Sequence, residues 1–175
     1  MSAIDLIVLG LVKKQPQGAY DIQKELEKRN ITQCVRISIP AIYKKVLQLE
    51  NKGYIKSHVT KSGKMPEKAV YQITESGDAY FIELMNDLSK KSIKIHLDIN
   101  SVIMNLDIIP TNQKLYFVTE IEHNIHEFKK MVEHNIELKT NIPFIGKSIL
   151  EQQHMLSLVL EAWISNLKLD IETNS

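Results

Sequence analysis

The chain has 175 residues, of which 43% are hydrophobic and 25% are charged, and its formal net charge is +1. This balance is ordinary for a soluble globular protein and excludes a mostly disordered chain, while the length suits one domain or two small ones. The sequence has no apolar run long enough to cross a bilayer.

Cysteine content and the N-terminal sequence indicate a cytoplasmic protein. The apolar run from Ile4 to Val12 is too short for a secretory signal and contains Asp5. Cys34 is the only cysteine, so an internal disulfide is excluded. We expect Cys34 to be a reduced packing residue, with a redox switch beside Arg36 as the alternative.

The small net charge hides an asymmetry along the chain. Residues 1–80 contain thirteen Lys and Arg against eight Asp and Glu, a net of +5, whereas residues 81–175 contain nine against thirteen, a net of −4. A basic front half joined to an acidic back half is typical of a protein whose front half meets a polyanion. Chance variation along the chain gives differences of this size as well.

Two predicted helices open the chain. The first spans Ala3–Lys14 and is apolar on nearly every side, which predicts burial. A second helix follows over 19–30 with a polar outer face, and Val35 and Ile37 are expected to form a short strand before the next helix. Two helices joined by a short turn match helix-turn-helix organisation.

The segment 36–55 carries the most informative pattern. Ser38 suits an N-cap, Pro40 suits the first helical turn, and Gly53 suits a left-handed helix end. The apolar positions of this helix are Ile39, Ile42, Val46 and Leu49. The opposite face is small, polar and basic, with Ala41, Lys44, Lys45, Gln48 and Lys52. Such a face fits the major groove of DNA, although a solvated amphipathic helix has the same pattern.

A change to alternating periodicity after Gly53 predicts a β-hairpin. Tyr54–Val59 and Ala69–Ile73 are the expected strands. The tip between them, Thr60–Lys68, contains three lysines, Lys61, Lys64 and Lys68. We interpret the hairpin as a wing whose lysines contact DNA phosphates, with an ordinary solvated turn as the alternative.

The remaining chain is predicted to be helical. Thr74 should cap a helix that ends near Ser89–Ser92, which places a domain boundary between domains 1–90 and 91–175. A short helix over 97–106 and two long helices over 112–141 and 147–169 should follow.

The two long helices form an antiparallel hairpin that cannot bury all of its own apolar surface, so we expect a homodimer. The alternative is a monomer in which the hairpin covers its own front domain. The expected dimer contacts are Leu156, Leu160, Trp163, Ile164 and Leu167.

Catalytic motifs are missing from the sequence. It has no Gly-rich phosphate loop, no nucleophile elbow and no CxxC pair, so we predict neither an enzyme nor a cofactor. His123 and His126, with Glu122 and Glu127, are the one cluster that could bind metal, but exposed histidines are common on a polar helix, so we predict no metal site. Trp163 is expected in the core or interface, with an effector pocket as the alternative.

Four ordered blocks in the first 80 residues resemble the PadR family of bacterial transcriptional regulators: LGL at 9–11, GAYDI at 18–22, IY at 42–43 with LQLENKGYI at 47–55, and YQITESG at 71–77. The resemblance implies a mainly α fold, with an N-terminal winged helix-turn-helix domain, a two-stranded β-wing and a C-terminal dimerisation hairpin. It also implies repression of nearby genes and release of double-stranded DNA when a small aromatic or drug-like effector binds.

By position, the resemblance adds residues of the predicted helix over 19–30 and of the start of the helix in segment 36–55 to the expected DNA contacts. The full set expected at DNA is Tyr20, Ser38, Pro40, Ala41, Tyr43, Lys44, Lys45, Gln48, Lys61, Lys64 and Lys68. Two other functions fit the same sequence. One is a winged-helix module that binds protein, and the other is a helical ligand- or metal-binding protein without specific DNA binding.

Overall fold

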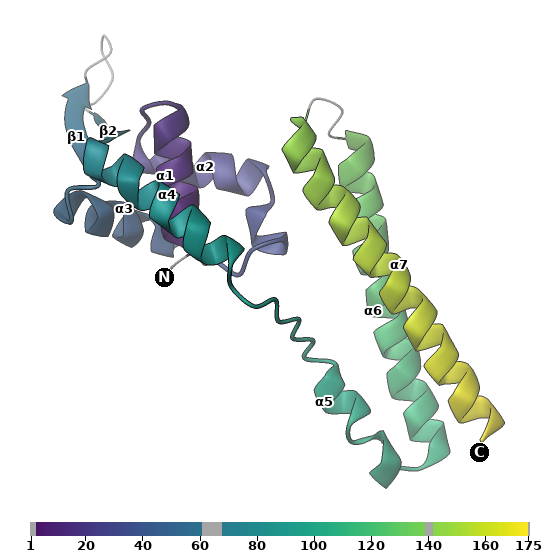
Figure 1. Cartoon of the computed structure of the whole chain (residues 1–175). Helices are drawn as coiled ribbons and strands as arrows, with labels where there is room; N and C mark the ends of the chain where they lie inside the picture. Colours follow the sequence, from purple (N-terminus) through teal and green to yellow (C-terminus); the bar gives the residue numbers. More distant parts are fainter. Residues whose placement is uncertain (1–2, 61–67, 139–141, 175) are drawn as a thin grey trace. The chain divides into compact units, whose positions relative to one another are not determined.

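The chain folds as two units, Met1–Ile93 and Lys94–Ser175, which we call the N-terminal and the C-terminal unit. The computed structural model describes residues 3–60, 68–138 and 142–174. The predicted fold class is confirmed, because the chain is mainly helical with a single two-stranded antiparallel sheet in the described residues (Figure 1).

Helix α1 lies at the centre of the N-terminal unit. It spans Ala3–Lys14, as predicted, and contacts α3, α4 and β2. Burial on several sides explains why this helix has almost no polar face. The other elements of the unit are α2 (Ala19–Lys28), the short 3-10 helix η1 (Ile31–Gln33), α3 (Ala41–Asn51), β1 (Ile55–Thr60), β2 (Lys68–Ile73) and α4 (Glu75–Ser89).

The core of the N-terminal unit gathers side chains from all its helices and from the wing. Val8 and Leu9 of α1, Ile22 of α2, Ile42 and Val46 of α3 and Leu84 of α4 have no exposed surface. The apolar positions predicted for α3, which are Ile39, Ile42, Val46 and Leu49, all belong to this cluster or pack against it.

Two details of the turn before α3 differ from the prediction. Pro40 is the N-cap of α3, and Ser38 makes no side-chain cap; its carbonyl instead accepts the Ala41 N–H at 3.1 Å. The predicted strand at Val35 and Ile37 is wrong, because η1 and an irregular stretch lead into α3. The end of α3 is as predicted, since Gly53 has a φ of +75°.

The wing pairs β1 with β2 in the register that runs from Ile55 opposite Ile73 to Thr60 opposite Lys68. A further bridge joins the segment before α2 to the sheet, where Gln17 and Tyr71 exchange both backbone hydrogen bonds, at 3.1 and 3.0 Å. The wing is thus attached to α2 as well as to α3.

A tight junction joins the wing to α4. Thr74 caps the helix as predicted, because its Oγ1 accepts the Gly77 N–H at 3.1 Å. A Cβ on Gly77 would lie 1.9 Å from the carbonyl oxygen of Tyr54, so no larger residue fits at this position. The Tyr54 ring stacks on Tyr80 of α4, with ring centroids 4.2 Å apart.

The C-terminal unit consists of a helical hairpin and two short elements before it. Helices α6 (Thr111–Leu138) and α7 (Phe144–Thr173) run antiparallel and side by side (Figure 1). The helix predicted over 97–106 is much shorter, since α5 spans only Asn100–Ile103 and the 3-10 helix η2 spans Leu106–Ile108. Among the described helices, none is long and apolar enough to span a membrane.

Candidate nucleic-acid interface

Helix α3 turns a polar and aromatic face to solvent. Its buried residues, Ile42, Val46 and Leu49, fall on one side. The opposite side exposes Tyr43, Lys44, Leu47, Gln48 and Asn51, and we call these five residues the outward face of α3. A cation, two amides, a phenol and an aliphatic group can together contact phosphates, base edges and thymine methyl groups.

Lys45 lies apart from the other predicted contacts of α3. Its ammonium is 2.9 Å from Oδ1 of Asp5 on α1, and the Lys45 side chain is only 22% exposed. Lys45 thus sits at the border between the buried side of α3 and the outward face. Ala41 is half-buried in the first turn, whereas Ser38 and Pro40 are exposed just before it.

The N-terminal end of α2 carries a second group of exposed side chains. Tyr20 is 53% exposed, and Nζ of Lys24 lies 5.2 Å from the centre of its ring. The contact with Tyr20 raises the pKa of Lys24. Because an exposed ammonium stacked on an aromatic ring stays available for a phosphate, this pair suits a position beside the DNA backbone.

The tip end of strand β2 is fastened to α2. Asp21 pairs with Lys68, the first residue of β2, and also accepts the Gly18 N–H at 3.2 Å. The hydrogen bond from Lys68 is the main reason why the pKa of Asp21 lies below its usual value. Lys61 and Lys64, the other predicted wing contacts, lie outside the described residues.

Four exposed residues that were not among the predicted DNA contacts lie on the same helices as those contacts or just before them. Leu47 and Asn51 are on the outward face of α3, Lys24 is on α2, and Arg36 precedes α3. The four-residue spacing between Tyr20 and Lys24 was a usable signal, because such residues are neighbours on a helix. Leu47 had none, since an exposed leucine on an amphipathic helix looks like a core residue.

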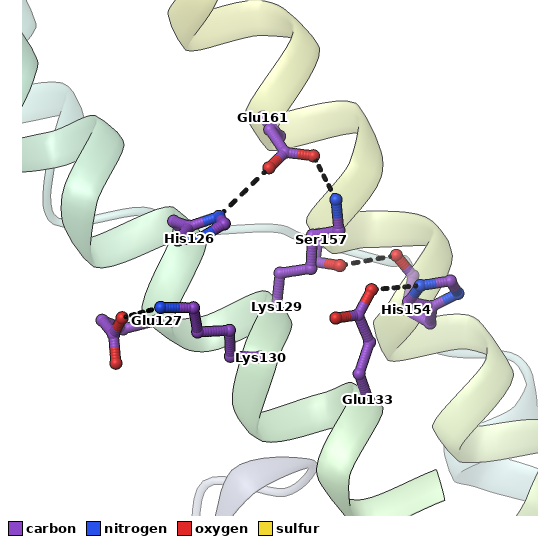
Figure 2. A network of polar contacts seen from close by, with 8 residues as sticks. All are labelled: His126, Glu127, Lys129, Lys130, Glu133, His154, Ser157 and Glu161. Atoms are coloured by element: carbon purple, nitrogen blue, oxygen red, sulfur yellow. Dashed lines mark hydrogen bonds and ion pairs between the residues drawn. The ribbon is translucent and has the colours of Figure 1, made fainter. Parts of the chain in front are cut away.

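Ion pairs cross the C-terminal hairpin from α6 to α7. Glu161 of α7 lies 2.6 Å from Lys129 and 3.4 Å from His126, and Glu133 lies 3.3 Å from His154 (Figure 2). The hydrogen bond from Lys129 is the main cause of a lowered Glu161 pKa. A further pair joins Lys168 to Glu122 at 2.6 Å, so charges on the two helices fix their register.

The residues predicted for dimer contacts have different environments. Ile164 is fully buried within the C-terminal unit itself, so its side chain belongs to the hairpin core. Leu160, Trp163 and Leu167 are half-buried against that core, and Leu156 is 41% exposed. A partner chain could reach Leu156 most readily of the five.

A row of exposed apolar side chains follows one side of α7. We call Ile145, Ile149, Met155, Leu156 and Val159 the apolar strip. Met155 and Val159 are each 66% exposed, and with Leu156 they line a shallow groove. An exposed row of apolar side chains of this kind is a candidate surface for binding protein.

The remaining candidates form no metal-binding group in the described residues. No group of three or more His, Cys, Asp and Glu side chains there is placed to hold a metal ion. His126 contacts Glu161 rather than His123. Cys34 is exposed at the end of η1, not packed as predicted, and its Sγ lies 3.9 Å from the Asn30 carbonyl oxygen.

Comparisons with known proteins show which family the N-terminal unit is similar to. Residues 8–83 match the sequence model of the transcriptional regulator PadR-like family. The comparison with curated proteins found no matching sequence.

Solved structures are similar over nearly the whole chain. Bacillus subtilis PadR in complex with operator DNA has a TM-score of 0.83 at 16% identity, covering 97% of this chain and 99% of that one. The same protein in complex with p-coumaric acid has a TM-score of 0.80 at 14% identity, covering 98% of each chain. The Vibrio cholerae virulence activator AphA has a TM-score of 0.73 at 15% identity, covering 99% and 100%. At these identities the likeness establishes the fold.

Proposed function

Because residues 8–83 match the sequence model of the transcriptional regulator PadR-like family, we propose that this chain binds an inverted-repeat operator in double-stranded DNA as a homodimer. The outward face of α3 enters the major groove, where Lys44 contacts phosphate and Gln48 bonds a base edge. Tyr20 and the wing lysines contact the backbone on either side.

The observation that carries this proposal is the exposure of the outward face of α3. That face has no acidic residue, and Lys24 on α2 and Arg36 before α3 are also exposed. Glu50, the one acid in α3, is half-buried, and its carboxylate accepts the Ser57 N–H at 3.1 Å. A phosphate backbone therefore meets cations and hydrogen-bond donors along α3 without a facing carboxylate.

Selection of duplexes from a random pool with the purified full chain tests the proposal directly. An inverted repeat should be recovered, and its affinity should fall with salt with a log–log slope of about 0.9 per neutralised phosphate. Lys44→Ala should lower the slope and Gln48→Ala should relax one base preference. Lys91→Ala, an exposed lysine after α4, is the matched control and should change neither. Binding without salt dependence would overturn the proposal.

Support for the homodimer comes from the apolar strip on α7. Burying Met155, Leu156 and Val159 of both copies would remove apolar surface from water at about 25 cal/mol per Å². Val159→Lys should therefore convert the dimer to a monomer in sedimentation velocity. Leu158→Lys is the matched control, because Leu158 is 42% exposed on the same helix but outside the strip. If both variants dissociate the dimer equally, the apolar strip is not the dimer interface.

A small aromatic effector is the proposed signal, acting on a repressor in the cytoplasm, where the operator would be. The support is the p-coumaric acid complex of a structurally similar protein. Titration with p-coumaric acid and related aromatic acids should release a labelled operator duplex in fluorescence anisotropy. If no aromatic acid releases the duplex, aromatic acids are not the effector class of this protein.

A protein-binding winged helix remains the second candidate function, and the exposed Leu47 on the outward face of α3 favours it. Leu47 would then anchor an apolar contact to a partner. Leu47→Ser should abolish partner binding in that case, whereas it should change DNA affinity only modestly if α3 lies in a groove. The salt slope of duplex binding separates the two functions.

A further inference from the structure

A buried ion pair joins the first helix to the proposed DNA-reading helix. Asp5 lies in the first turn of α1, and its side chain is only 8% exposed. Nζ of Lys45 on α3 lies 2.9 Å from Oδ1 of this carboxylate. The two residues are far apart in sequence, so the pair forms only when α1 and α3 pack against each other.

The Asp5 carboxylate is held by charge more than by aligned hydrogen bonds. Its Oδ1 is the one side-chain oxygen or nitrogen in the described residues that is buried without a hydrogen bond of regular geometry. The ammonium of Lys45 is within ion-pair distance of Oδ1, but the contact does not have the geometry of a hydrogen bond. Lys45 is thus the only described cation that compensates this charge.

The position of Lys45 on α3 allows the pair to control how this helix is rotated about its axis. Lys45 borders the buried side formed by Ile42, Val46 and Leu49, whereas Lys44, the next residue back, is exposed. Apolar contacts alone allow a helix to rotate slightly about its axis, because they are not directional. A charge pair at the border of the apolar side fixes one rotation.

We propose that Asp5 is a positioning residue for DNA reading, which through Lys45 fixes the rotation of α3 and keeps the Lys45 ammonium away from DNA phosphates. This inference rests on the proposed function. A buried pair is a poor source of stability, but it can select one arrangement among several that are close in energy. Here the selected arrangement determines which side chains of α3 face outward.

The salt dependence of binding distinguishes this role from a direct contact. If Asp5 holds Lys45, the ammonium releases no counterions when DNA binds. Neutralising Asp5 frees Lys45, and in a dimer two more phosphates can be neutralised. The log–log salt slope should then steepen by about 2, at 0.9 for each phosphate.

The experiment compares full-length variants on a duplex selected by the wild-type protein and on a scrambled duplex of the same composition. Asp5→Asn should steepen the slope by about 2 and reduce the preference for the selected duplex, while Asp5→Glu should keep both as in the wild type. The matched control is Asp78→Asn, which makes the same charge change at an exposed pair with Lys13, at 2.5 Å, and should leave both unchanged.

Lys45→Met gives an independent readout from the other partner of the pair. It should leave the slope unchanged and reduce the preference for the selected duplex. A slope reduced by about 2 would mean that Lys45 itself contacts phosphate, which overturns the proposal. So would a folded Asp5→Asn variant that binds as the wild type does, or an Asp78→Asn variant that changes as Asp5→Asn does. Wild-type protein that binds no duplex would instead overturn the proposed function.

Discussion

Removing one partner of the pair between Asp5 and Lys45 should destabilise the N-terminal unit by very different amounts, depending on which partner is removed. Lys45→Met leaves a carboxylate that is 8% exposed and has no other compensating cation in the described chain. Breaking a buried pair in this way costs about 3–5 kcal/mol. Because the Lys45 side chain is itself 22% exposed, we expect the lower end, about 3 kcal/mol.

Asp5→Leu should cost much less. The remaining ammonium sits on a flexible four-carbon stem at the border of the outward face of α3, so it can turn into solvent. We expect about 1 kcal/mol, a common value for a point substitution. The double variant Asp5→Leu with Lys45→Met should lie within about 1 kcal/mol of the wild type, because replacing a buried pair with apolar groups is often neutral.

Thermal unfolding followed by circular dichroism, together with hydrogen exchange of α1 amides, measures these changes. For a unit of this size, about 3 kcal/mol corresponds to a fall in Tm of about 12 °C or more. Trp163, the only tryptophan, lies in the C-terminal unit, so its fluorescence reports the hairpin and should change little. Equal costs for Lys45→Met and Asp5→Leu would refute the reasoning, because a buried carboxylate without a partner should cost more than a lysine that can turn into solvent.

Three further predictions concern the junction before α4 and the hairpin. Gly77→Ala should unfold or strongly destabilise the N-terminal unit in a urea titration, since its Cβ would lie 1.9 Å from the Tyr54 carbonyl oxygen. Thr74→Val should cost about 1 kcal/mol in the same titration through the lost N-cap; no change would mean that the cap is dispensable. Glu161→Gln should remove a stabilisation of the hairpin that Lys129 provides. Because the Glu161 pKa is lowered from 4.5, that stabilisation is present above pH 4.5 and is lost as the pH falls through the lowered pKa. Tryptophan fluorescence melts of wild type and variant should therefore differ at pH 7 and converge at low pH.

Local signals in the sequence were sufficient for α1, for the ends of α3 and α4 at Gly53 and Thr74, and for the wing. The all-apolar pattern of Ala3–Lys14 predicted a buried helix with the observed bounds, and Gly53 and Thr74 marked helix ends that the structure confirms. The alternation on either side of the wing tip predicted the paired strands. These features depend on residues within a few positions of each other, which is why periodicity and capping rules find them.

Non-local contacts were beyond these rules. Lys45 looked like an outward cation, because nothing near it in the sequence indicates that Asp5, forty positions earlier, would lie 2.9 Å from its ammonium. Ile164 looked like an interface residue because a dense apolar helix does not reveal which side its own hairpin covers. The start of α3 was misplaced for a local reason, since the Ile39–Pro40 turn delays the helix beyond Ser38.

Hydrogen bonds at the junction between α3, the wing and α4 separate the choice of bases within a half-site from the spacing between half-sites. The Gly53 carbonyl at the end of α3 accepts hydrogen bonds from Thr74 Oγ1 at 2.7 Å and Ser76 Oγ at 3.0 Å, and the Thr74 N–H donates to the Tyr54 carbonyl at 3.1 Å. Contacts within the N-terminal unit alone therefore fix the position of the wing relative to the proposed reading helix. In a homodimer, the second copy would set only the distance between the two reading helices, each with its own wing. Substitutions in the apolar strip of α7 should then change half-site spacing and affinity while leaving the preferred bases within each half-site unchanged.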